Sequence, residues 1–252
     1  MVTIKGEREL ALMREAGAII ARLFERLEGE VAPGVTTMRL DMLAERLITE
    51  SGGKPSFKGY PGAKGAKPFP GSICASVNAQ VIHGIPDGRR LREGDILSVD
   101  VGVSVGGYHT DAARTYAVGE VSPAAAKIIS VARECFYKGL GKAVAGNRVS
   151  DISGAVEDHA GANGFSVVRD WMGHGIGRLL HEKPEIPNFR VMARGARLSE
   201  GMTICIEPMI NGGTAEVLIG DDEWSVVTKD GSLSAHYENT VLIKAGESEI
   251  IT

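Results

Sequence analysis

Two aspartates lie in a stretch of the chain that is otherwise mostly small, apolar or β-branched. Ile96–Tyr116 forms two strand-like runs around Gly106-Gly107, a dipeptide typical of two-residue hairpins. With this loop, Asp111 faces Gly102, and Asp100 lies one diagonal step away on the same face. Unpaired acids are costly to bury, so this face is either exposed to water or beside a cation. The apolar residues on the alternate face favour a metal site.

Three further residues extend this pattern, because each places a charge or an imidazole in or beside a strand-like segment: His174, Glu207 and Glu238. Any one of them alone is more simply a paired structural group. Together with the two aspartates they supply four carboxylates and one imidazole, a set that suits Mn, Fe, Co or Zn and can bridge two ions. The hypothesis requires all five to converge. His236, two residues before Glu238, stays ambiguous.

The composition excludes several classes of protein. The chain has 252 residues, 43% of them apolar, and a net charge of −4 without a Lys/Arg run. Nucleic acid and anionic membranes are therefore not expected partners. We find no apolar stretch of membrane-spanning length and no signal peptide, and three widely spaced cysteines indicate a reducing compartment. We therefore expect a cytoplasmic protein with three free cysteines.

The elements that must position the five residues repeat in outline. Helices are predicted over Glu7–Leu27, from Thr36 or Thr37 to about Ser51, from Ser122-Pro123 to about Val144, and from a Ser150 cap to about Ala162. Strands are predicted at Ser72–Val77, Val81–Ile82, Phe165–Trp171, Met202–Met209, Ser225–Thr228 and His236–Ile243, besides the hairpin. Helix, glycine break, capped helix, glycine stop and strands occur twice, with Gly34 and Gly146 112 positions apart. This order predicts an α+β fold, an antiparallel sheet covered by helices, in one domain over residues 1–252.

Seven short motifs along the chain resemble the type I methionine aminopeptidases. They are His83-Gly84-Ile85-Pro86, Asp100-Val101-Gly102, Asp111, Gly173–Gly177, His181–Pro184, Ile206-Glu207-Pro208 and Glu238-Asn239-Thr240. They occur in the family's order from Ile4 to about Ile243, and their joint specificity is high although each is modest alone. The resemblance implies a pita-bread fold of two pseudo-symmetric halves, in agreement with the suspected duplication.

The resemblance also implies a site with two divalent ions, drawn from Co, Mn, Fe, Zn or Ni. Asp100 would bind one ion, His174 and Glu207 the other, and Asp111 and Glu238 would bridge them. In this family a metal-activated hydroxide attacks the first peptide bond. Glu207 would then carry the proton, and His181 and His83 would contact the scissile and leaving-side amides. The resemblance places the methionine pocket at Phe57, Tyr60, Phe69, Cys74 and Trp224.

The implied function is removal of the N-terminal methionine from nascent chains with a small second residue, at the ribosome, by a monomeric enzyme. Two alternatives stay open: a Xaa-Pro aminopeptidase or prolidase-like enzyme, and a non-catalytic binding protein on the same fold. One departure from the family is Pro61–Pro68, a segment six residues longer than usual and without the usual His-Gly dipeptide. We expect this segment to form a mobile flap over the substrate entrance.

Overall fold

The computed structural model describes residues 2–62 and 67–252. Within these ranges, the helices are α1 (Glu7–Glu28), α2 (Thr37–Glu50), α3 (Pro123–Leu140) and α4 (Val149–Ala162). The strands of the first half are β1 (Lys54–Pro55), β2 (Cys74–Val77), β3 (Gln80–Ile82), β4 (Ile96–Val105) and β5 (Tyr108–Ala117). Those of the second half are β6 (Ser166–Val167), β7 (Gly173–Gly175), β8 (Glu182–Ile186), β9 (Thr203–Ile206), β10 (Met209–Asn211), β11 (Val217–Ile219), β12 (Val226–Thr228), β13 (Ser234–His236), β14 (Glu238–Leu242) and β15 (Glu249–Ile250).

An antiparallel sheet connects the two halves of the chain. Its strands follow the order β1-β4-β5-β14-β9-β7-β8, with β2 also paired to β4 and β15 to β14. Two smaller sheets, β13-β10-β6 and β11-β12-β3, lie beside it among the described residues. β5 of the first half pairs directly with β14 of the second. Residues more than 100 positions apart in the chain therefore become neighbours at the centre of the sheet.

The predicted hairpin and its register are confirmed. Gly102 pairs with Asp111, and Asp100 pairs with Ala113. Gly106 and Gly107 have φ angles of 58° and 80°, the left-handed values that a tight two-residue loop requires and that glycine adopts without strain.

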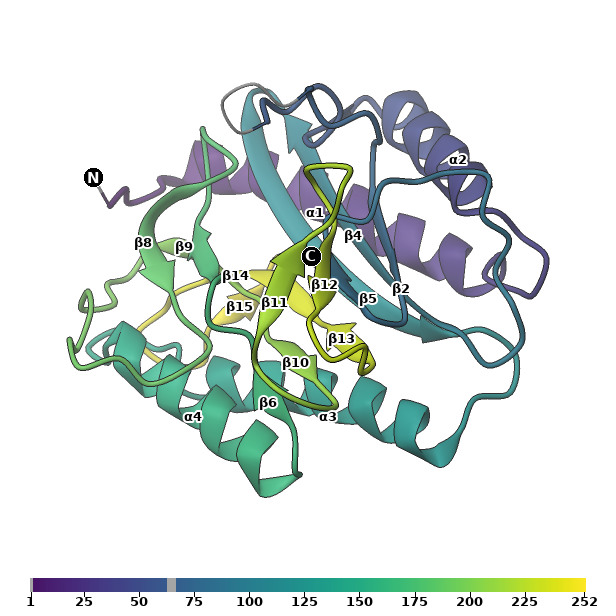
Figure 1. The fold of residues 1–252 in the computed structure, drawn as a ribbon. Helices are drawn as coiled ribbons and strands as arrows, with labels where there is room; N and C mark the ends of the chain where they lie inside the picture. The colour runs from purple at the N-terminus through teal and green to yellow at the C-terminus, as the bar shows by residue number, and fades with distance from the viewer. Residues whose placement is uncertain (1, 63–66) are drawn as a thin grey trace.

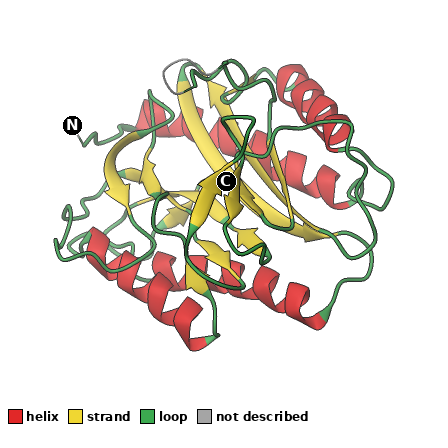
Figure 2. Ribbon diagram, viewed as in Figure 1, coloured by secondary structure: helices red, strands yellow, loops and turns green. Residues whose placement is uncertain are grey.

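The helices pack against the strands as two pairs, one from each half of the chain. Figures 1 and 2 show α1 and α2 on one side and α3 and α4 on the other, with the strands between them. Each pair has its own apolar core: the first includes Ile20, Leu40 and Val99, and the second includes Phe136, Ile152 and Ile204. This arrangement agrees with the two-halved α+β fold predicted from the repeated order of elements.

Two predicted helix ends were wrong. α3 ends at Leu140, not near Val144, because Gly139 and Gly141 flank that residue and glycine weakens a helix. α4 begins at Val149, so Ser150 lies inside its first turn, and the Asp151 carboxylate accepts the Arg148 backbone N–H at 2.7 Å. Thr36 caps α2 as predicted.

The predicted flap at Pro61–Pro68 includes residues 63–66, which lie outside the described residues. Among the described residues, no helix has both the length and the apolar character needed to cross a bilayer.

Candidate metal centre

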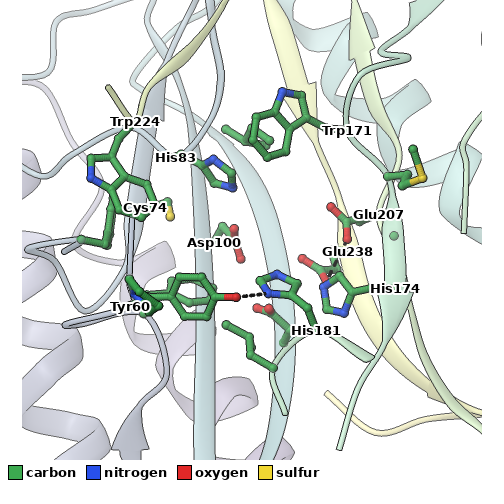
Figure 3. Close-up of a pocket in the computed structure, with 18 of the residues that line it drawn as sticks. Tyr60, Cys74, His83, Asp100, Trp171, His174, His181, Glu207, Trp224 and Glu238 are labelled. Carbon is green, nitrogen blue, oxygen red and sulfur yellow. Dashed lines mark hydrogen bonds and ion pairs between the residues drawn. The ribbon is translucent and has the colours of Figure 1, made fainter. Parts of the chain in front are cut away.

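Five neighbouring strands of the large sheet deliver the five predicted ligands. In the spatial order β4, β5, β14, β9, β7, they carry Asp100, Asp111, Glu238, Glu207 (directly after β9) and His174. The strand register aligns these residues across the sheet, because Asp100 and Glu238 both pair with Ala113, and Asn239 pairs with Ile206. Figure 3 shows these side chains, except the unlabelled Asp111, gathered around one cavity. The structure thus brings together all five residues that the sequence singled out.

The two hairpin aspartates lie in an environment that opposes their charge. Asp111 is buried, and each carboxylate has one buried oxygen without a hydrogen-bond partner among the described residues. Burial raises the pKa of Asp100 to about 7, and burial with the nearby Asp100 raises that of Asp111 well above its ordinary range. Such a pair is stable as two anions only when a positive charge compensates it.

The two glutamates show the same behaviour. Burial, and then the charges of the aspartates, raise the pKa values of Glu207 and Glu238 well above the ordinary range. Glu238 also has a buried oxygen, Oε1, without a partner among the described residues. In the described part of the chain, neither glutamate forms an ion pair with a Lys or Arg.

The tautomer of His174 suits metal binding. Its Nδ1 lies 2.9 Å from the Gly175 carbonyl oxygen, which can only accept, so Nδ1 carries the proton. Nε2 is then unprotonated and carries a free lone pair, and it lies 3.5 Å from Oε1 of Glu207. Burial lowers the pKa of His174 to about 3, which keeps the ring neutral. A divalent cation between Nε2 and Oε1 would bind an electron pair from each.

These observations fit a divalent cation. One oxygen from each of Asp100, Asp111 and Glu238 lies within 4.8 Å of the other two. A cation there would satisfy the unpartnered oxygens and reverse the pKa shifts of the carboxylates.

The centre opens into a cavity of about 450 Å³, and all twelve residues proposed from the sequence line it. The pocket residues Phe69 and Trp224 meet edge to face, with ring centroids 5.1 Å apart. The Cys74 thiol is buried, which raises its pKa well above 9, so it is an uncharged part of the wall. All three cysteines are free, as expected, and all three are buried.

The two predicted catalytic histidines face the same cavity, as Figure 3 shows. Nδ1 of His181 lies 2.7 Å from the Tyr60 hydroxyl, and its ring contacts that of His174 with centroids 4.4 Å apart. His83 packs edge to face on Trp171 at 4.8 Å. Burial lowers the pKa of both histidines, to about 4 for His83, so both rings are neutral at pH 7.

Several lining residues were not predicted from the sequence. They include Trp171, Met172, Glu185, Ile219 and Glu223. Trp171 was the easiest of these to predict, since it is one of only two tryptophans and lies two residues before Gly173, where the Gly173–Gly177 motif begins.

Comparison with known proteins gives one consistent result. Residues 11–245 match the model of metallopeptidase family M24. The chain is 51% identical to methionine aminopeptidase from Clostridium perfringens and 46% identical to methionine aminopeptidase 1 from Bacillus subtilis; each match covers 100% of this chain and 99% of the relative. The crystal structure of methionine aminopeptidase from Thermotoga maritima superposes with a TM-score of 0.96 at 38% identity, covering 100% of this chain and 99% of that one. Prolidase from Pyrococcus furiosus shares the fold, with a TM-score of 0.76 at 21% identity, and this chain covers 65% of it.

Proposed function

We propose a catalytic role for each site residue on the premise that this chain belongs to metallopeptidase family M24, where it groups with the type I methionine aminopeptidases. Its function is the removal of the N-terminal methionine from proteins and peptides by hydrolysis of the first peptide bond. One observation carries the assignment of residues: four carboxylates and an imidazole from five adjacent strands meet at one cavity without a compensating Lys or Arg ion pair among the described residues.

Members of the family are metallopeptidases, and here the five residues would hold two divalent ions. Asp100 would bind one ion, His174 and Glu207 the other, and Asp111 and Glu238 would bridge. Carboxylates with one imidazole accept Co, Mn, Fe, Zn or Ni. When bound, such ions act as Lewis acids that polarise a carbonyl group and lower the pKa of water.

Glu207 is the residue that would carry the proton between water and the leaving amine. Its carboxylate lines the cavity, where it can accept a proton from water and later donate it to the amine. A group in this position takes a proton as the peptide bond is attacked and returns it when the bond breaks.

His181 would stabilise the oxygen of the scissile amide. If the Tyr60 hydroxyl donates to Nδ1, the ring proton resides on Nε2, which is then free to donate to a developing oxyanion. His83, held against Trp171, would contact the amide on the leaving side.

The apolar end of the cavity would bind the methionine side chain. Phe57, Tyr60, Phe69, Cys74 and Trp224 supply aromatic and sulfur surfaces, which suit a flexible thioether. We further propose that the enzyme acts as a monomer in the cytoplasm, on nascent chains at the ribosome whose second residue is small.

The test combines metal analysis with peptide cleavage. The purified chain, supplied with Co²⁺ or Mn²⁺, should release free methionine from Met-Ala-Ser and leave an Ala-Pro peptide uncut. Substituting each of the five ligands in turn by Asn or Gln should lower both the metal content and the release. Asp158→Asn, which removes only an exposed ion pair with Arg190, is the matched control and should change neither. Full methionine release by Asp111→Asn would refute the assignment.

A further inference from the structure

His236 is a buried imidazole that the five-ligand assignment leaves without a role. It ends β13, two residues before Glu238, and is 1% exposed. Neither ring nitrogen has a hydrogen-bond partner among the described residues. Buried polar groups are nearly always satisfied, so these two nitrogens call for a bound water or ion.

The surroundings of Nε2 favour a cation as one such partner. Nε2 lies 3.8 Å from Oε2 of Glu238 and 3.9 Å from Oε2 of Glu207. Both distances are too long for hydrogen bonds. They fit two donors on one ion, because ligands at roughly 2.1 Å from a metal lie about 3 to 4 Å apart, depending on the angle between them.

The Glu207 carboxylate therefore lies between two imidazoles. Its Oε1 faces Nε2 of His174 at 3.5 Å, and its Oε2 faces Nε2 of His236. The backbone holds His236 in this place: its N–H donates to the Thr115 hydroxyl at 3.0 Å, its carbonyl accepts from the same hydroxyl at 2.8 Å, and it pairs with Met209 in the sheet. These bonds fix the backbone of His236 beside the two carboxylates.

We propose that His236 is a second imidazole ligand of the centre, and that Glu207, His236 and Glu238 form a site for a borderline divalent ion such as Zn²⁺ or Co²⁺. One oxygen of each carboxylate and a ring nitrogen of His236 all lie within 4.8 Å of one another, and neutral imidazole with carboxylates suits these ions. Both glutamates line the cavity, so the ion reaches the site from there. The inference rests on the proposed metal centre, with which it shares two carboxylates.

The direct test locates the metal. Crystals of the Zn²⁺-saturated wild-type protein should show an anomalous difference peak about 2.0–2.1 Å from Nε2 of His236. A saturated crystal whose zinc peaks all lie more than about 2.5 Å from that nitrogen would overturn the proposal, and this result requires no variant.

A solution measurement separates a ligand from a merely structural residue. His236→Gln keeps an amide that can form hydrogen bonds but loses the imidazole, so its Zn²⁺ affinity by isothermal titration should fall by at least about 10-fold. His159→Gln removes an imidazole of α4 that is paired with Glu134 of α3, and it should leave the affinity unchanged. Equal affinities of wild type and His236→Gln would contradict the proposal. Methionine release by wild type with no zinc at His236 would refute this inference alone, whereas release by Asp111→Asn would refute the proposed function.

Discussion

Replacing Asp100 by Asn should stabilise the metal-free protein at high pH while it weakens metal binding. In the folded protein, burial raises the pKa of Asp100 from 3.8 to about 7. Between these values the folded state keeps a proton that the unfolded chain releases. The contribution of protonated Asp100 to the free energy of unfolding is therefore complete below about pH 4 and is lost as the pH rises through about 7.

The size of the effect follows from the displacement of the pKa. A change from 3.8 to about 7 corresponds to about 4 kcal/mol, at roughly 1.4 kcal/mol for each factor of ten. By linkage, Asp100 lowers the free energy of unfolding of the metal-free protein by about 2 kcal/mol at pH 5 and about 4 kcal/mol at pH 8. An asparagine is never charged, so the advantage of Asp100→Asn should grow by about 2 kcal/mol over this interval.

The assay is urea unfolding followed by circular dichroism, with EDTA present, for both proteins at pH 5 and pH 8. Asp158→Asn, an exposed aspartate paired with Arg190, serves as the control and should change stability by less than about 1 kcal/mol. Curves for Asp100→Asn and wild type that stay parallel between the two pH values would refute the reasoning, as would a variant less stable than wild type at pH 8.

Three further predictions follow from the same geometry. Zn²⁺ at 100 times its dissociation constant should add about 2.7 kcal/mol to the free energy of unfolding, measured by thermal melting, and Asp111→Asn should abolish most of this gain. His181→Ala should lower kcat about 10²- to 10³-fold in steady-state kinetics, and Tyr60→Phe should have a smaller effect because it removes only the contact with Nδ1. Gly173→Ala should lower both the melting temperature and the metal affinity, because a Cβ there would lie 2.3 Å from the Cys205 carbonyl oxygen and separate β7 from β9.

Each of these predictions has its own contrary result. A zinc-dependent gain that survives intact in Asp111→Asn would place the metal elsewhere. A Tyr60→Phe effect on kcat as large as that of His181→Ala would mean that the phenol itself contacts the substrate. For the glycine, Gly161→Ala is the matched control, since a Cβ at that position meets no atom of the described residues within 4 Å. If both alanine variants bind metal like wild type, close packing at Gly173 does not position His174.

The sequence by itself determined the local features of the site. The side-chain alternation of the hairpin and the conformational freedom of Gly106-Gly107 were enough to place Asp100 and Asp111 on one face in the correct register, because both are properties of adjacent residues. The same local logic located the four helices. It missed two of their ends, where a glycine pair and the Asp151 side chain decided the boundary.

Only the tertiary structure decided which strands are neighbours. The order β4-β5-β14-β9-β7 joins segments from both halves of the chain, and no local pattern specifies such pairing. That order brings five residues that are far apart in the sequence to one cavity. It also places His236 beside Glu207 and Glu238, whereas the sequence around His236 left its role open. The physical reason is that periodicity and turn chemistry act between near neighbours, whereas strand order and the burial of charge depend on how the whole core packs.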